Sequence, residues 1–149
     1  MSESKKVIAQ NRKARHEYFI IERYEAGIAL TGTEIKSIRE GRVNLTEAYI
    51  RIIDNEAFIV GMHIGLYTQG NRFNHEETRT RKLLLKKREI NKLHKAIQLE
   101  GYTIIPLSLY LTRGLAKLEI AQAKGKKLYD KRQTEKDRDI KRQLQKMVR

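Results

Sequence analysis

Three side chains that could hold a metal ion follow one another at His75, Glu76 and Glu77. An imidazole beside two carboxylates can bind a divalent cation and activate a water molecule for attack on a phosphodiester. The remaining histidines do not stand at ligand spacing from one another: His16, His63 and His94. A metal-dependent nuclease is therefore one hypothesis, and a solvated polar loop is the simpler interpretation of the same three residues.

Other enzyme classes have less support. The chain contains no cysteine, which excludes thiol catalysis and a disulfide framework. It has no nucleophile elbow and no P-loop, and its nine glycines are scattered rather than gathered into a phosphate cradle. We therefore expect a non-catalytic protein that uses no metal and no cofactor.

The charge balance points to a polyanionic partner. Among 149 residues, 32 Lys and Arg stand against 18 Asp and Glu, a net charge of +14. Nucleic acid is the first candidate for such an excess, and a membrane surface is the second. No stretch approaches the ~18 apolar residues of a spanning helix, and the N-terminus lacks the apolar run of a signal peptide. The absence of cysteine fits the reducing cytoplasm, where we expect the protein to work.

Two polar stretches carry residues suited to RNA. Arg12, Lys13 and Arg15 follow Asn11 and either clamp phosphates or form a solvated arm. Residues 70–74 combine an aromatic side chain with a cation and two amides, a set that suits stacking on an unpaired base and contacts to its edge. The alternative for this second stretch is a polar loop with its aromatic ring in the core.

Two further features are open to both interpretations. A basic run surrounds Leu83–Leu85 and either faces phosphates or is a solvated strand edge: Arg79, Arg81, Lys82, Lys86, Lys87 and Arg88. Glu34 either accepts a hydrogen bond from a base or ribose, or is a carboxylate placed favourably at the start of a helix. The residues alone favour the helix interpretation for Glu34.

Short strands with tight connections must position these residues. Period-2 patterns and turn residues predict strands at Glu17–Glu22, Ile28–Leu30, Ala48–Ile53, Ala57–Ile64, Thr103–Thr112 and Leu115–Ala121. One short helix is expected from an N-cap at Thr33 to Gly41, and a longer one over Lys87–Gly101. At least six antiparallel strands with two helices predict a mainly β protein, a small barrel.

The chain divides by composition into an arm, a body and a tail. We expect a loose basic arm over residues 1–15, a β-barrel body over 16–123 and a basic tail over 124–149. Residues 121–149 hold eleven Lys or Arg against four Asp or Glu, half of the net charge. The apolar residues of the tail fit one helical face: Ile140, Leu144, Met147 and Val148. Such a segment is expected to be disordered when free and helical when bound.

Four stretches resemble one known family. They are NRKARHEYFI at Asn11–Ile20, GTEIKSIREGRVNL at Gly32–Leu45, GNRFNHEETRTRKLLLKKREI at Gly70–Ile90 and GKKLYDKR at Gly125–Arg132. Together they are similar to the bacterial SsrA-binding protein family, also called small protein B or SmpB. The resemblance covers nearly the whole chain from Asn11, and its motifs are long and in the same order.

This resemblance implies a fold and a non-catalytic role. The family has an antiparallel β-barrel with an OB-like core, and it binds the tRNA-like domain of transfer-messenger RNA (tmRNA). The alanylated RNA arrives at stalled ribosomes with elongation factor Tu and GTP for trans-translation, the rescue of the ribosome and tagging of the incomplete peptide. The tail would occupy the decoding centre and the empty message channel as a helix. The free protein is expected to be a monomer.

The resemblance also assigns residues by matching motifs. It implies that Glu34 contacts RNA, in place of the helix interpretation above. The RNA-facing set that it implies is Asn11, Arg12, Lys13, Arg15, Glu34, Lys36, Asn71, Arg72, Phe73, Leu83, Leu84, Leu85, Lys86, Lys87, Lys124, Gly125, Lys126 and Lys127. The ribosome-facing tail set is Tyr129, Asp130, Lys131, Arg132, Ile140, Leu144, Met147 and Val148. Tyr129 stands where many family members carry His, so it can stack on a base but cannot become cationic.

Besides the nuclease, one further alternative stays open. A structural ribosomal protein is also basic and tailed, and it would co-purify stoichiometrically with washed ribosomal subunits.

Overall fold

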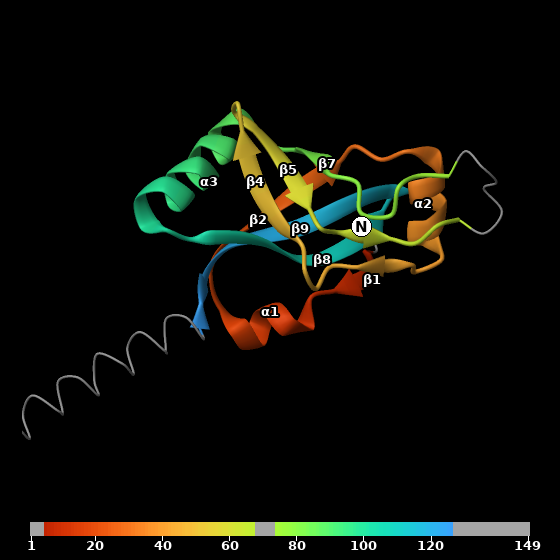
Figure 1. The fold of residues 1–149 in the computed structure, drawn as a ribbon, viewed down its shortest axis with the longest axis horizontal. Coiled ribbons are helices and arrows are strands. Elements are labelled where there is room, and N and C mark those ends of the chain that lie inside the picture. Colours follow the sequence, from red (N-terminus) through yellow and green to blue (C-terminus); the bar gives the residue numbers. More distant parts are fainter. Residues whose placement is uncertain (1–4, 68–73, 127–149) are drawn as a thin grey trace, which may run out of the picture.

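The computed structural model describes residues 5–67 and 74–126. Its elements follow one another along the chain as Figure 1 shows: β1 (Lys6–Gln10), α1 (Arg12–Glu17), β2 (Tyr18–Ile28), α2 (Gly32–Arg39), β3 (Val43–Asn44), β4 (Tyr49–Ile53), β5 (Glu56–Val60), β6 (His63–Ile64), β7 (Arg81–Leu84), α3 (Lys87–Glu100), β8 (Thr103–Thr112) and β9 (Leu115–Gly125). The prediction of a mainly β fold with short helices is confirmed.

Antiparallel pairing organises the strands into one large sheet and one small one. The large sheet has the order β1-β8-β4-β5-β7-β2-β9, and β8 also pairs with β9, so that the pairing returns to β8. A long ladder joins β2 to β9, from Tyr18 opposite Gly125 to Gly27 opposite Lys117, and the ladder between β8 and β9 has as many pairs. The two-residue strands β3 and β6 pair separately beside α2.

The main core lies inside this ring of strands. It contains Ile50, Ile59, Leu109 and Leu118, each at most 3% exposed, and α3 contributes Leu93 to it. A second cluster lies on the outer face of β8 and β9, where Ala14 of α1 packs on residues of both strands. This cluster fixes α1 beside the C-terminal end of β9, in the lower left of Figure 1.

The β4–β5 hairpin was predicted, but the buried face of its second strand was not. Asp54 and Asn55 both have positive φ, 50° and 62°, as a tight two-residue turn requires. Ala57 and Ile59 are then buried, whereas Phe58 and Val60 are only half-buried. Gly61 has φ +82° and interrupts the strand, which changes the phase of the alternation. Beyond it Met62 and Ile64 are buried.

Two predictions for the N-terminal region are wrong. Residues 6–15 are not a loose arm, because β1 pairs with β8 from Lys6 opposite Leu111 to Gln10 opposite Ser108. The predicted turn at Ala26-Gly27 is absent, because β2 continues through both residues to Ile28. Gly27 serves close packing instead, since a Cβ there would lie 3.2 Å from that of Leu84.

The other elements differ from prediction in detail. The helix α3 is confirmed and ends at Gly101 with φ +68°. The N-cap of α2 is Thr31 rather than Thr33. A register shift between Pro106 and Ser108 turns Leu107 away from the core side that Leu109 occupies, so the two side chains pack in different clusters.

The C-terminal boundary also differs. β9 runs to Gly125 and so includes the first two residues of the predicted tail, Lys124 and Gly125. The predicted helix on Ile140, Leu144, Met147 and Val148 lies outside the described residues, as does every other expectation for residues 127–149. Within residues 5–67 and 74–126, no helix is long and apolar enough to span a membrane.

Candidate nucleic-acid interface

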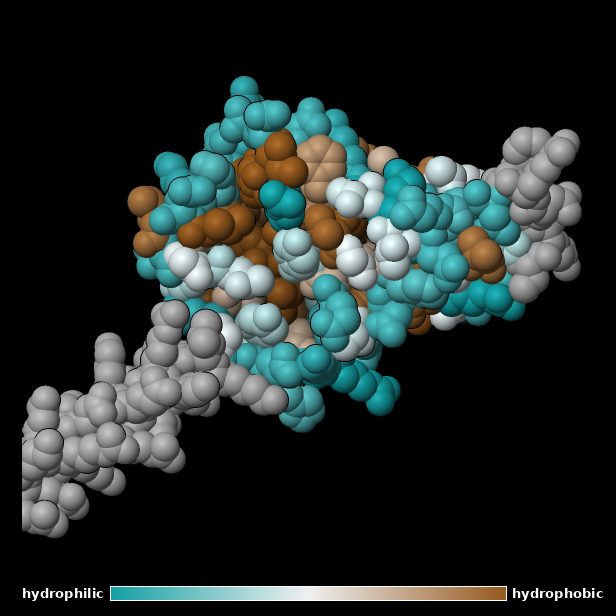
Figure 2. Space-filling model, in the orientation of Figure 1, coloured by the Kyte–Doolittle hydropathy of each residue, from teal (hydrophilic) through white to brown (hydrophobic). Residues whose placement is uncertain are grey.

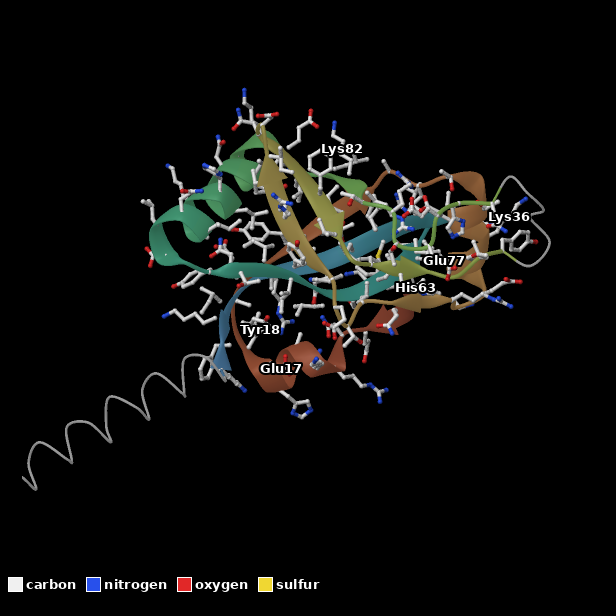
Figure 3. All side chains as sticks on the ribbon, viewed as in Figure 1. Glu17, Tyr18, Lys36, His63, Glu77 and Lys82 are labelled. Carbon is white, nitrogen blue, oxygen red and sulfur yellow. The ribbon has the colours of Figure 1, made fainter. Side chains whose placement is uncertain are left out.

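The described candidate residues fall into three groups on different parts of the molecule. Figure 3 marks them by Glu17 and Tyr18 beside α1, by Lys36 on α2, and by Lys82 on β7. We call these the α1 group (Arg12, Lys13, Arg15, Lys124 and Lys126), the α2 group (Lys36, Tyr67 and Asn74) and the β7 edge (Lys82, Leu84, Leu85, Lys86 and Lys87). The fold therefore does not gather all predicted residues into one site.

Asn11 supports the α1 group from within the fold and is not part of its exposed surface. It is only 5% exposed. Its Oδ1 accepts a hydrogen bond from the Ala14 amide at 3.2 Å and so caps α1, and its Nδ2 donates to the Pro106 carbonyl at 3.0 Å. The polar atoms of Asn11 are used within the protein in this geometry, and its direct RNA contact stays a prediction.

Arg12 and Arg15 are exposed on α1, where Asn11 holds them. Lys13 is also exposed, and its ammonium lies 3.4 Å from a carboxylate oxygen of Glu47 and 3.9 Å from one of Glu17. An exposed pair of this kind stabilises a fold by at most about 1 kcal/mol, so the Lys13 ammonium is available to other anions.

The end of β9 brings further cations to α1. Lys126 donates a hydrogen bond to the Arg15 carbonyl at 3.2 Å, and its ammonium lies 5.1 Å from the centre of the Phe19 ring. The Lys124 ammonium lies 5.4 Å from the centre of the Tyr102 ring. Gly125 pairs with Tyr18 across the ladder. Residues more than a hundred positions apart thus form one basic surface with aromatic rings beneath it.

The α2 group lies at the opposite end of the molecule. The Lys36 ammonium is 5.4 Å from the centre of the Tyr67 ring. Asn74 accepts a hydrogen bond from the Tyr67 amide at 3.1 Å and donates to the Tyr67 carbonyl at 2.6 Å. These two bonds join the chain before residue 68 to the chain after residue 73. The predicted stacking set Asn71, Arg72 and Phe73 lies outside the described residues.

Glu34 is a buried anion held by two arginines. It is 0% exposed, and its carboxylate accepts hydrogen bonds from Arg79 at 2.6 Å, from the Thr31 amide at 2.8 Å, and from Arg81. Burial raises the pKa of Glu34, but the bonds from Arg79, Thr31 and Arg81 outweigh it and bring the pKa to about 2. Glu34 is therefore ionised and fully used inside the protein.

Arg81 shares this burial. It is 0% exposed and donates to the Met62 carbonyl at 2.7 Å and to the Glu77 carbonyl at 3.1 Å as well as to Glu34. Burial lowers the pKa of Arg81, and Glu34 opposes that change. Glu34 and Arg81 use these polar atoms within the protein, and the RNA contact implied for Glu34 and the phosphate contact considered for Arg81 stay predictions. The helix interpretation of Glu34 is confirmed, as part of a capping box with Thr31.

The β7 edge is divided between the core and the surface. Leu83 is 1% exposed and belongs to the core, and its contact with RNA stays a prediction. Leu84 is 55% exposed, and Lys86 and Lys87 are exposed. Lys82 lies 3.6 Å from a Glu56 carboxylate oxygen on β5. An open cavity beneath Leu84 has a volume of about 670 Å³ and is lined by apolar and charged residues of both signs.

The metal-dependent nuclease hypothesis finds no site in the described part of the chain. Both ring nitrogens of His75 are engaged, since Nε2 donates to the Ile64 carbonyl at 2.9 Å and Nδ1 accepts from the Thr33 hydroxyl at 2.9 Å. Glu77 lies against His63 instead, at 2.6 Å, as Figure 3 shows. Residues 5–67 and 74–126 contain no group of three His, Cys, Asp or Glu residues placed to hold a metal ion.

Sequence reasoning missed the residues that support these surfaces. The T-x-x-E pattern from Thr31 to Glu34 is the signal of a capping box and would have placed the start of α2 correctly. No pattern reveals that Tyr67 lies under Lys36, because 31 residues separate them in the sequence.

Comparisons with known proteins agree on one family. The model of the family described as "SmpB protein" matches residues 8–149. An SsrA-binding protein of Geobacillus thermodenitrificans is 56% identical over 144 residues, which cover 97% of this chain and 93% of the relative. One of Thermoanaerobacter pseudethanolicus is 57% identical over 141 residues, covering 95% and 90%. A solved structure described as "tmRNA-SmpB: a journey to the center of the bacterial ribosome" is 44% identical with a TM-score of 0.68, over 79% of this chain and 83% of that one.

Proposed function

Because this chain belongs to the SmpB protein family, we propose that it binds the tRNA-like domain of tmRNA and brings it to stalled ribosomes for trans-translation. The observation that carries the proposal is the match over residues 8–149, with relatives named SsrA-binding protein along almost the whole chain. The net charge of +14 supports it, because an RNA partner needs neutralising cations. The protein acts as a binding factor and not as a catalyst.

The exposed residues of the α2 group and the β7 edge contact the RNA in this proposal. Lys36 lies beside Tyr67, which directly precedes segment 68–73 in the sequence. That segment carries Asn71, Arg72 and Phe73. Leu84, Lys86 and Lys87 are exposed on the β7 edge. Glu34 contributes indirectly, because its bonds to Arg79 and Arg81 join α2 to the segment before β7. It is a positioning residue.

The α1 group and the tail face the ribosome or its RNA. Lys124 and Lys126 at the end of β9 join Arg12 and Arg15 of α1 in this group, with Lys126 hydrogen-bonded to the Arg15 carbonyl. From there Lys127 continues the basic surface, and residues 129–149 enter the decoding centre and the empty message channel as a helix. Elongation factor Tu with GTP joins the complex through the charged RNA. The protein works as a monomer in the cytoplasm, and its ring of strands is an OB-like barrel.

Deletion of Leu128–Arg149 tests this division of labour. The described body ends at Lys126, so the truncated protein keeps every described contact. We expect its affinity for tmRNA to stay within about threefold of that of the full chain, because the counterion-release contribution of the body is kept. Tagging of peptides on stalled ribosomes should be lost.

Two measurements on the same variant separate the outcomes. Binding is measured by titration with labelled tmRNA. Tagging is measured by the appearance of the tagged peptide in a translation reaction whose message lacks a stop codon. Normal tagging by the truncated protein would contradict the role of the tail. A large loss of tmRNA affinity would instead place the tail on the RNA.

A further inference from the structure

A groove between β4 and α3 lies apart from the α2 group and the β7 edge. β4 pairs with β8 at Ile50 and Ile104, and the two strands diverge from that point. Figure 2 shows apolar residues, in brown, gathered in this region beside hydrophilic residues in teal. The cavity has a volume of about 290 Å³, close to the lower end of small-molecule sites at about 300 Å³.

The groove combines aromatic rings with hydrogen-bonding and cationic groups. Tyr49 from β4 and Tyr102 from the segment before β8 line it, and Tyr49 is 40% exposed. The other lining groups that matter are polar: Arg51, His94, Gln98 and Thr103. No acidic residue is among those that line this groove. The Lys124 ammonium, 5.4 Å from the Tyr102 ring, adds positive charge at its edge.

These groups match the parts of an unpaired nucleotide. A tyrosine ring offers a face on which any base can stack. An amide and a hydroxyl can donate to and accept from the edge of a base, and a guanidinium pairs with phosphate. The charge of the groove is complementary to RNA, whereas an acidic residue would be expected among the lining groups of a site for a basic peptide.

A second cavity continues the groove toward α1. It has a volume of about 240 Å³ and shares Tyr49 and Thr103 with the first. Lys13 also lines this second cavity, together with Glu17 and Glu47, whose carboxylates pair with its ammonium. A chain of nucleotides seated at Tyr49 can therefore extend toward the cations of the α1 group.

We infer that the β4–α3 groove binds one or two unpaired nucleotides of RNA, with a base stacked on Tyr49 or Tyr102 and a phosphate near Arg51. This site lies outside the motifs that assign the tmRNA-binding residues. It goes beyond the proposed function and is tested with short oligonucleotides, so its failure leaves the tmRNA proposal standing.

The test compares two truncations on the same strand in the full-length protein. Tyr49 and Ile53 are both on β4 and are 40% and 43% exposed, but only Tyr49 lines the groove. The ligands are a labelled six-nucleotide oligoadenylate and an abasic oligomer with the same number of phosphates. We expect Tyr49→Ala to weaken hexamer binding about fivefold or more, and Ile53→Ala less than about twofold. The abasic oligomer should bind both variants equally.

A charge-matched pair and a covalent readout complete the test. Arg51→Gln should weaken binding of both ligands more than Lys92→Gln, because Lys92 is exposed on α3 outside the groove. A hexamer with one photoreactive 4-thiouridine should cross-link to Tyr49 or Tyr102 in the unaltered protein. Equal hexamer affinity of the Tyr49→Ala and Ile53→Ala variants, or cross-links confined to other regions, would overturn the inference. The groove would then be a better candidate for binding a protein segment.

Discussion

The structure of the α2 end of the molecule depends on Glu34, whose carboxylate is buried. It satisfies the N-terminal amide of Thr31 and two guanidinium groups that follow it by 45 and 47 positions. Removing one partner of such a buried pair leaves charge in a low-dielectric environment without compensation. A loss of RNA binding on mutation of Glu34 would therefore report damaged positioning and not a missing contact.

Glu34→Gln should destabilise the fold. We expect the free energy of unfolding at pH 7 to fall by about 3–5 kcal/mol, because Arg81 stays buried and loses its anion. The matched control is Glu40→Gln at the end of the same helix, where the carboxylate is 40% exposed and 3.5 Å from Arg42. The control should change stability by less than about 1 kcal/mol. Urea unfolding followed by circular dichroism measures both, and equal effects would contradict the buried-pair account.

The pH dependence of stability has a defined sign. The folded state lowers the pKa of Glu34 from 4.5 to about 2, so the stabilisation is complete above pH 4.5 and is lost as the pH falls toward 2. Between pH 6 and pH 3 the unaltered protein should therefore lose about 2 kcal/mol more than Glu34→Gln does. Parallel stability curves for the two proteins over this range would show that the carboxylate is not held as described.

At the scale of elements, the β4–β5 hairpin depends on a glycine that breaks its regular alternation. Gly61 has φ +82°, and a Cβ on it would lie 3.0 Å from the Glu47 carbonyl oxygen, which is backbone and cannot easily move. The interruption places Met62 and Ile64 in the core after Ala57 and Ile59. Gly61 therefore sets the register of the strand and also allows a close approach of two chain segments.

Gly61→Ala should cost more stability than a substitution with the same backbone strain alone. The control is Gly114→Ala in the β8–β9 turn, which has φ +76° and open space around the added Cβ. The control should lose about 1 kcal/mol from its backbone conformation. Gly61→Ala should lose at least about 1 kcal/mol more, since overpacking adds to the strain. Thermal unfolding compares the two, and equal losses would mean that the Glu47 segment relaxes freely.

The elements that sequence reasoning predicted correctly are those with local signals. The hairpin turn at Asp54-Asn55, the helix ending at Gly101 and the long strand β8 were all indicated by turn, cap or alternation patterns. The wrong predictions depend on distant partners. β1 is a strand because β8 offers it an edge, and β2 passes through Gly27 because β9 and β7 pair there. No local pattern contains that information.

The predictions for the candidate site divide in the same way, into those with local signals and those that depend on distant segments. Sequence motifs located the basic stretches and the family resemblance, but they assigned Asn11, Glu34 and Leu83 to the surface. Each of the three side chains is at most 5% exposed, because segments far away in the sequence pack over it. The type of a residue near RNA-binding motifs does not show whether its side chain contacts RNA or supports the residues that do. Only its hydrogen-bond partners do, and those are set by the tertiary fold.

The whole molecule separates its basic surfaces. The α1 group and the α2 group lie at opposite ends of the sheet in Figure 1, and the β7 edge lies between them on another side. A body with cations on several faces can contact more than one RNA surface at once, which is what a factor joining tmRNA to a ribosome requires. Such a protein also risks binding any polyanion, so shape recognition must add to charge.

The most direct test of the central claim is a titration of the purified full-length protein with tmRNA and with an ordinary tRNA at two salt concentrations. Each neutralised phosphate contributes about −0.7 to −0.9 to the slope of log affinity against log salt, so both affinities should fall as salt rises. The account predicts a preference for tmRNA that persists at the higher salt. Equal binding of both RNAs that is lost together at high salt would contradict it, and a structural ribosomal protein would then be the better interpretation.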